Sequence, residues 1–240
     1  KGIELSAFVV PVQTGDFSWK LNANFTINRN KVVELYDGVD NLQLGSFQGG
    51  VTLNATIGEP YGVLKGTNFV YLNGQKVVAT SGYYAQTDAT SIIGNITPDW
   101  KMGITNSFNY KALSFSFLID IQKGGSVFSL DQYYGLATGL YAETDVLNDK
   151  GVSVREKIDN GGGWVYPGVK ADGTTNTTRV SGENYGIFGY RRNPAGAFVY
   201  DASYVKLREV TVSYKLPANL FGGSNFIKGA TLSAVGRNLW

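Results

Sequence analysis

Strict alternation of apolar and polar residues is the strongest pattern in this 240-residue chain. It is clearest over residues 16–28, where every second residue is apolar and the residues between are polar or charged. The apolar positions are Phe17, Trp19, Leu21, Ala23, Phe25 and Ile27. A period of two places alternate side chains on opposite faces of a strand. The segment is therefore predicted to be a long β-strand with one apolar face and one polar face.

A second alternating stretch covers residues 101–122 and is interrupted at Lys111-Ala112. Leu118 is the one apolar residue among the polar positions of its second half. The pattern predicts a hairpin whose arms have about 10 residues each, the length of a tilted transmembrane strand.

The remaining strand signals are weaker. Asn73-Gly74 is a strong two-residue hairpin signal between two short apolar segments. Within 203–216 the apolar parity switches, which predicts a β-bulge near Arg208-Glu209. The weaker predicted strands are 2–10, 61–72, 75–80, 203–216 and 226–238, which brings the total to about eight.

Short connections are expected at 11–15, 73–74, 111–112 and 217–225, and long ones at about 30–58, 81–99 and 123–200. Short turns at one end of the strands and long loops at the other are typical of an outer-membrane β-barrel. A soluble β-sandwich also alternates and remains an alternative. The sandwich requires Phe17, Trp19, Leu21, Phe115 and Phe117 to point into a dry core between two sheets, whereas the barrel places them against lipid.

The composition limits the kinds of chemistry that this chain can perform. Charged residues make up 17% and aromatic residues 13%, and there is no Cys and no His. A folded soluble domain has about 25% charged residues. The absence of Cys and His removes thiolate nucleophiles, the commonest general base and the commonest transition-metal ligands. We therefore expect no enzyme activity and no cofactor. The net charge of +2, with scattered Lys and Arg, argues against nucleic-acid binding.

Several motifs occur in a fixed order along the chain. They are Pro98-Asp99-Trp100 with Gly103 and Asn106, Lys123-Gly124-Gly125, Leu147-Asn148-Asp149-Lys150-Gly151, Ala202 to Glu209 followed by Ser213-Tyr214, and Gly236-Arg237-Asn238-Leu239. Through these motifs the chain resembles the C-terminal barrel portion of SusC/RagA-type TonB-dependent outer-membrane transporters.

This resemblance implies a fold class and a cellular context. Residues 1–240 would form part of an all-β antiparallel transmembrane barrel, about eight of the roughly 22 strands that enclose a plugged lumen. The plug and the earlier strands would be absent, and 123–200 would be a long extracellular loop. The expected location is the outer membrane of a Gram-negative, Bacteroidota-like bacterium. The resemblance further implies energised import of a bulky nutrient, a glycan more than a peptide. It also implies a SusD-like surface lipoprotein, the TonB complex and membrane lipid as partners.

A passive porin is an alternative function, and a glycan-binding β-sandwich is a further one. A porin would need no TonB energy and no plug. The sandwich would be soluble and would place the aromatic rows in its interior.

Asp120, Arg208 and Glu209 are the candidate polar groups of the lumen. Asp120 lies on the polar row of the second hairpin arm, and Arg208 and Glu209 lie at the predicted bulge. They could contact the plug or the substrate, or they could be ordinary lumen polarity with local ion pairing.

The long loop is rich in aromatic residues, which could stack on sugar rings, pack on the lipoprotein or form the loop's own small core. These candidates are Tyr133, Tyr134, Tyr141, Trp164, Tyr166, Tyr185 and Tyr190. A short helix is expected over 132–136. Asp145, Asn148, Asp149 and Asp159 are oxygen donors without EF-hand spacing, so the loop carries only a weak calcium signal.

Overall fold

The computed structural model describes residues 1–182, 186–221, 227 and 229–240. The chain divides into two compact units. The sheet unit comprises 1–30, 98–125 and 202–240, and the loop unit comprises 31–97 and 126–201.

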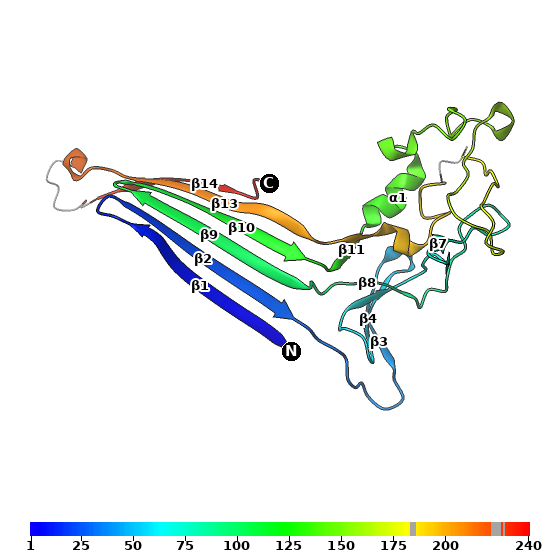
Figure 1. Cartoon of the computed structure of the whole chain (residues 1–240), viewed down its shortest axis with the longest axis horizontal. Coiled ribbons are helices and arrows are strands. Elements are labelled where there is room, and N and C mark those ends of the chain that lie inside the picture. The colour runs from blue at the N-terminus through cyan, green and yellow to red at the C-terminus, as the bar shows by residue number, and fades with distance from the viewer. Residues whose placement is uncertain (183–185, 222–226, 228) are drawn as a thin grey trace. The chain divides into compact units, whose positions relative to one another are not determined.

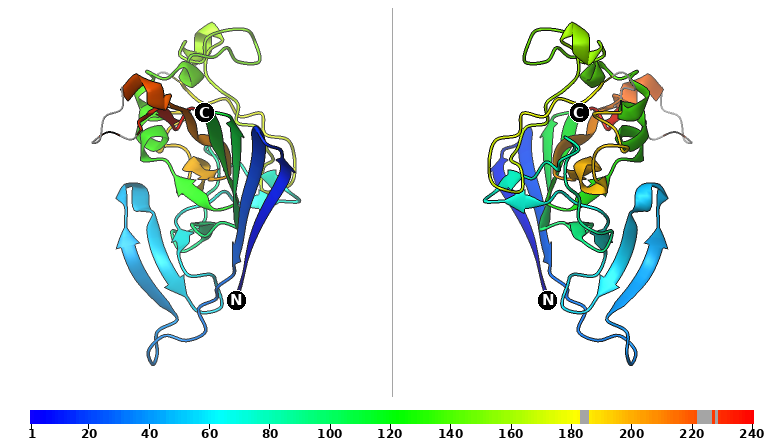
Figure 2. Two further views of the ribbon diagram at one scale, coloured as in Figure 1. Left: turned by 90° about the vertical axis from the view of Figure 1, so that its left-hand side faces the viewer. Right: turned by 90° about the vertical axis from the view of Figure 1, so that its right-hand side faces the viewer.

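The sheet unit consists of six long antiparallel strands in the order β1-β2-β9-β10-β13-β14. Their bounds are β1 Gly2–Gln13, β2 Phe17–Asn28, β9 Trp100–Tyr110, β10 Leu113–Lys123, β13 Tyr204–Lys215 and β14 Thr231–Arg237. Figures 1 and 2 show these strands side by side as a single layer, with the β1–β2 and β9–β10 hairpin turns at the same end. The predicted antiparallel all-β fold is confirmed, and short connections alternate with long ones along the sheet. The predicted connections 30–58, 73–74 and 81–99 are wrong as separate connections, because all three lie in the single long connection between β2 and β9.

The register brings the apolar residues of neighbouring strands into continuous rows. One row runs from Ala7 through Ala23, Ile104 and Ile119 to Leu207. Aromatic rings pack along the same face, where Trp19 stacks on Phe108 with ring centroids 5.8 Å apart. The opposite face carries hydrogen-bonded polar rows, such as the one in which Asn109 joins Ser18 and Ser114. The strand alternation therefore produces one apolar and one polar face, as predicted.

The sandwich alternative requires a second layer over the apolar face. Among the described residues, every buried side chain belongs to the loop unit and none belongs to the sheet unit. Phe115 is 37% exposed and Leu5 is 60% exposed. The described part of the sheet unit therefore has no dry interior of the kind that a sandwich needs.

Asn106 is a polar residue in an apolar row. In the register it stands opposite Leu21 on one side and Phe117 on the other. The indole N–H of Trp19 donates a hydrogen bond to its Oδ1 at 3.1 Å. A polar group on an apolar surface is costly unless it has a partner, and Trp19 supplies one.

The first hairpin turn is shorter than the sequence pattern indicates. β1 continues through Pro11 to Gln13, so the predicted turn at 11–15 shrinks to residues 14–16. The register shifts between Val9 and Val12, which marks a bulge at Val10 and Pro11. Proline cannot donate to a ladder but is tolerated at a bulge.

The loop unit has short strands, one α-helix and four 3-10 helices within the described residues. The strands are β3 Asn41–Ser46, β4 Thr52–Thr56, β5 Val63–Lys65, β6 Tyr71–Leu72, β7 Gln75–Lys76, β8 Ile92–Asn95, β11 Ser126–Phe128 and β12 Val199–Asp201. The helices are α1 Leu130–Thr138 and the 3-10 helices η1 Gln48–Gly50, η2 Ala142–Thr144, η3 Ile158–Asn160 and η4 Ala195–Phe198. A further 3-10 helix, η5 Ala218–Phe221, belongs to the sheet unit. Figure 2 shows β3 and β4 as a light-blue hairpin.

Two small cores hold the loop unit together. One is built on Val78, Val154, Tyr166, Val180 and Ile187, and the other on Val51, Leu64 and Ala195. The first core joins segments more than a hundred positions apart, since Val78 lies before β9 and Ile187 lies after β10. The long connections are therefore packed structure rather than open loop.

Two predicted long strands, 61–72 and 75–80, are wrong as spanning elements. Only Val63–Lys65, Tyr71–Leu72 and Gln75–Lys76 are strands, and all lie in the loop unit. The six strands of the sheet therefore replace the expected eight. Gly62 lies directly before β5 and has φ +92°, so the backbone is not extended at this position. The hairpin at Asn73-Gly74 is confirmed, with φ values of 51° and 80°, as a type I′ turn requires.

The last predicted strand, 226–238, corresponds to β14 Thr231–Arg237, and Phe226 lies outside the described residues. No helix in the described ranges has the length and hydrophobicity to cross a membrane.

Candidate functional site

The predicted bulge in β13 is confirmed and falls on Arg208. Leu118 of β10 pairs with Glu209, and the next residue, Ile119, pairs with Leu207, which leaves Arg208 as the extra residue. An extra residue lets two consecutive side chains leave the strand towards the same face. Arg208 and Glu209 can therefore both serve the polar face of the sheet.

Arg208 is the centre of a polar cluster. Its Nε donates to Asp120 Oδ2 at 3.0 Å and its Nη2 donates to the same oxygen. The Tyr204 hydroxyl donates to that oxygen at 3.1 Å, and Arg208 Nη1 donates to Asn238 Oδ1 at 3.0 Å. The bulge thus connects β10 and β13 with the residue that follows β14.

Glu209 forms a separate pair. Arg237 Nε donates to its Oε2 at 3.0 Å, and Thr211 Oγ1 donates to its Oε1 at 3.3 Å. All three sequence-predicted lumen groups are thus engaged in local ion pairs on the polar face. Whether they also contact a plug or a substrate stays a prediction.

A double-mutant cycle tests the bulge cluster. We expect Asp120→Asn and Arg208→Met to show a small favourable coupling in the free energy of unfolding, measured by urea titration of the full-length protein in bilayers. The value is modest because the two side chains are 26% and 36% exposed, so water screens the pair. Lys206→Met is the matched control. Lys206 stands directly opposite Asp120 in the register but lies over the Tyr204 ring at 4.2 Å. If Asp120 couples equally strongly to Arg208 and to Lys206, Arg208 is not its specific partner and the cluster is wrong.

Tyr133, Tyr134 and Tyr190 form one aromatic cluster in the loop unit. Tyr133 stacks on Tyr190 with centroids 4.9 Å apart, and Tyr134 contacts both rings edge-on at 5.0 and 5.2 Å. Tyr133 also packs edge-on against Phe128 and Phe198. Burial and the neighbouring tyrosines raise the pKa of Tyr133.

Tyr166 and Trp164 pack in a second group. Tyr166 is 3% exposed, and its hydroxyl donates to the Ile187 carbonyl. Burial is the main cause that raises its pKa, so it stays a neutral donor. The ring centroids of Tyr166 and Tyr84 are 4.8 Å apart. Trp164 packs edge-on against Phe188, with ring centroids 5.6 Å apart. Tyr166 therefore belongs to the core of the loop unit.

Tyr141 follows α1 and lies so close to Gly135 that a Cβ there would be 2.3 Å from its Cζ. Tyr185 lies outside the described residues. Of the seven predicted aromatics, the structure therefore brings three into one cluster and two into another group.

The loop unit contains an open groove of about 750 Å³ beside α1. It is lined by Val127, Phe128, Ser129, Gln132, Leu136, Glu143, Phe188 and Tyr200. The expected short helix at 132–136 is confirmed as α1 Leu130–Thr138. Ser129 caps it by accepting a hydrogen bond from Gln132 N at 3.2 Å, and Gly139, with φ +74°, ends it.

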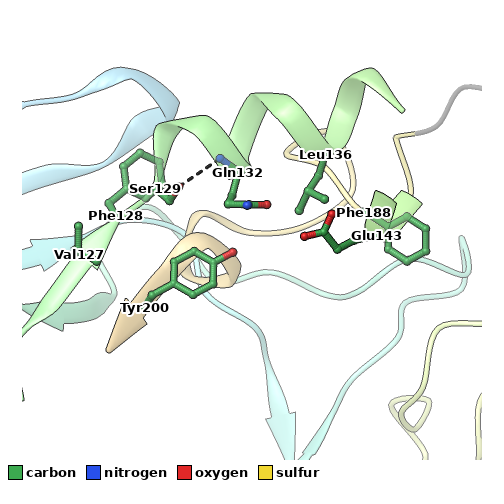
Figure 3. A pocket seen from close by; sticks show the side chains of 8 residues that line it. All are labelled: Val127, Phe128, Ser129, Gln132, Leu136, Glu143, Phe188 and Tyr200. Atoms are coloured by element: carbon green, nitrogen blue, oxygen red, sulfur yellow. Dashed lines mark hydrogen bonds between the residues drawn. The ribbon is translucent and has the colours of Figure 1, made fainter. Parts of the chain in front are cut away.

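Three polar groups converge in this groove. Figure 3 shows the Gln132 amide, the Glu143 carboxylate and the Tyr200 hydroxyl directed into the same hollow, between Phe128 and Phe188. Within the described part of the chain, none of these three side-chain groups has a hydrogen-bond partner. Burial, and then the charge of Glu143, raise the pKa of Tyr200. An apolar hollow with a few convergent polar groups is the usual form of a small-molecule site.

None of the groove residues was singled out from the sequence. Tyr200 comes from β12 and Phe188 from the segment before η4, far from α1 along the chain. The helix signal at 132–136 could have pointed to Gln132 and Leu136. Nothing in the sequence pattern indicated that Glu143 would face the same hollow.

The oxygen donors of the loop do not converge on a cation. No group of three or more His, Cys, Asp or Glu that could hold a metal ion occurs among the described residues. Asp149 instead accepts two hydrogen bonds from Arg179 Nη2, at 2.5 and 2.7 Å. Hydrogen bonding to Arg179 lowers the pKa of Asp149.

An antiparallel sheet with one aromatic, apolar face, one hydrogen-bonded polar face and long packed loops between its strands is typical of the wall of an outer-membrane β-barrel. Curated relatives agree with this class. The chain is 26% identical to TonB-dependent receptors P26 and P3 of Formosa agariphila, over 100% of its length and 24% of theirs. It is 24% identical to TonB-dependent receptor P39 of the same organism. The resemblance seen in the sequence motifs is confirmed.

Solved structures agree in fold. A chain of the RagAB peptide importer in its closed-closed state matches with a TM-score of 0.62 at 21% identity, over 100% of this chain and 25% of that one. The open-open state matches with a TM-score of 0.62 at 20% identity, over 24% of that chain. No family model matches the chain. The chain spans about a quarter of the length of the curated relatives it matches.

Proposed function

We propose that the protein containing this chain is an outer-membrane, TonB-dependent active importer of a bulky nutrient, and that residues 1–240 supply part of its barrel and extracellular loops. The support is the similarity to TonB-dependent receptors over the whole chain, together with the two-faced sheet. An apolar face suits lipid, and a polar, hydrogen-bonded face suits a water-filled lumen. Nothing in this mechanism requires the chain to make or break bonds.

We further propose a glycan, rather than a peptide, as the nutrient, bound in part in the groove beside α1. The observation that carries this proposal is the combination of aromatic rings with uncharged and acidic hydrogen-bonding groups in one hollow. The C–H face of a sugar ring packs on an aromatic ring, while its hydroxyls need groups that donate and accept, such as Gln132, Glu143 and Tyr200. Import of peptides is the second candidate, since the RagAB structures are of a peptide importer. Their identity of about a fifth supports the shared fold and does not extend to the substrate.

A SusD-like surface lipoprotein is the proposed partner on the extracellular side. Exposed aromatic residues of the loop unit, such as Tyr134 at 41% exposure, are suitable contacts for it. TonB would act through a part of the protein other than residues 1–240.

Uptake measurements in cells test this function. We expect cells that carry the full-length protein to take up a labelled oligosaccharide, and we expect uptake to cease when TonB is deleted. Tyr200→Ala should weaken uptake at low substrate concentration about tenfold, which corresponds to about 1.4 kcal/mol. Tyr36→Ala is the matched control, because Tyr36 is 67% exposed and outside the groove. TonB-independent uptake would instead favour the passive porin, and uptake of peptides alone would favour the second candidate.

A further inference from the structure

A second hollow of the loop unit is built around a lysine. It has a volume of about 510 Å³. Its lining includes Phe69, Lys76, Tyr84, Trp164, Phe188 and Asn193. No acidic residue is among its described lining residues. The hollow is therefore aromatic and positively charged, unlike the groove beside α1, which contains Glu143.

The β6–β7 hairpin places Lys76 in this hollow. The type I′ turn at Asn73-Gly74 fixes the register Tyr71 to Lys76, and the next residue, Val77, is buried in the loop unit. The Lys76 ammonium lies 3.6 Å from the Phe69 ring centroid and 5.1 Å from that of Tyr84. The hairpin thus holds a cation against two aromatic faces.

Lys76 has no ionic partner in the described part of the chain, and its ammonium donates no hydrogen bond there. The neighbouring polar side chains are already engaged. The Tyr84 hydroxyl donates to the Pro167 carbonyl at 3.0 Å, and Asn193 Nδ2 donates to the carbonyls of Ile187 and Gly189. Burial lowers the pKa of Lys76, because the surroundings stabilise its charge less well than water does. Ring faces attract the ammonium, but its hydrogen-bond donors remain available.

We propose that this hollow binds an acidic sugar residue, with Lys76 pairing with the sugar carboxylate and the aromatic side chains packing on its ring. A carboxylate is expected because Lys76 is a cation without an ionic partner and no acidic residue is among the described residues that line the hollow. The sugar ring follows from the aromatic lining, and this part of the inference rests on the proposed glycan import. A volume of about 510 Å³ has room for one such residue within a longer chain.

Binding of two matched probes to the purified full-length protein tests the proposal. Methyl β-glucuronide and methyl β-glucoside share one ring and differ only in the carboxylate. We expect the wild-type protein to bind the glucuronide at least tenfold more tightly by calorimetry, with a preference that falls at high salt. Lys76→Met should remove the preference, and Lys76→Arg should retain part of it. Lys157→Met is the control, because Lys157 is exposed and outside the hollow.

Three outcomes would overturn the proposal. They are equal binding of the two probes to the wild-type protein, no binding of either probe, or an unchanged preference in Lys76→Met. Acetylphenylalanine serves as a carboxylate without a sugar. If it binds more tightly than the glucuronide and loses its binding in Lys76→Met, the occupant is not a sugar. Uptake into cells distinguishes a failure of this proposal from a failure of the proposed glycan import. If cells with Lys76→Met still take up a neutral oligosaccharide in a TonB-dependent way, the proposed import holds even where the acidic-sugar site is wrong.

Discussion

Replacing Phe117 with Arg is expected to destabilise the full-length protein in its membrane by about 2–4 kcal/mol. Phe117 lies near the middle of β10, in an apolar row between Asn106 and Val210. Its ring also packs near Phe108 and Phe115, with centroids 6.3 and 5.8 Å away. A guanidinium at this position would face the hydrocarbon near the bilayer midplane, where its desolvation costs most. Urea titration in lipid bilayers measures the loss, and a lower amount of folded protein in outer membranes should accompany it.

Ser116→Arg is the matched control for this substitution. Ser116 precedes Phe117 in the same strand and points to the opposite, polar face, where it pairs with Ser107 and Thr211. The same added charge should therefore cost well under 1 kcal/mol, because a polar lumen solvates it. If the two variants are equally stable, the assignment of the two faces is wrong.

The sheet was predictable because its information is local. Alternation with period two assigns each side chain to a face without any knowledge of the partner strands. The same logic located the bulge, since the parity of Val205 and Leu207 differs from that of Val210 and Val212. The sequence did not indicate that Asp120 would pair with Arg208 rather than with Lys206, its direct register neighbour. That choice depends on the side-chain directions that the bulge creates.

The loop unit was less predictable because its contacts are distant in sequence. Segments before β9 and after β10 share one core, in which Val78 is buried by packing against Val154 and Val180 and not by pairing in a long strand. Apolar runs of this length do not distinguish these two cases. The aromatic candidates were found by composition, and the structure shows that Tyr133 and Tyr166 mainly contact other rings of the loop unit. The groove residues Glu143 and Tyr200 carry no sequence signal, since only the fold brings them together.

The motif Leu147 to Gly151 gives the second large expected effect, through Asn148. This side chain is 7% exposed and makes four hydrogen bonds to the backbone. Its Nδ2 donates to the carbonyls of Gly161 and Gly163 at 2.8 and 3.0 Å. Its Oδ1 accepts from Lys150 N at 2.9 Å and Val152 N at 3.2 Å. One amide thus closes a tight turn and ties it to a second segment, which explains how a single asparagine can organise the motif.

Asn148→Ala should therefore destabilise the loop unit by about 2–4 kcal/mol, at roughly 1 kcal/mol for each hydrogen bond lost. We expect faster amide exchange at Lys150 and Val152 and faster tryptic cleavage after Lys150 in the full-length protein, while the sheet remains protected. The exchange and cleavage rates of Asn148→Asp should lie between those of the wild type and Asn148→Ala, because a carboxylate keeps the acceptors but cannot donate to Gly161 and Gly163. Asn160→Ala, at an exposed position of η3, should leave exchange and cleavage unchanged. Wild-type protection in Asn148→Ala would mean that the glycine turns hold this segment without the amide.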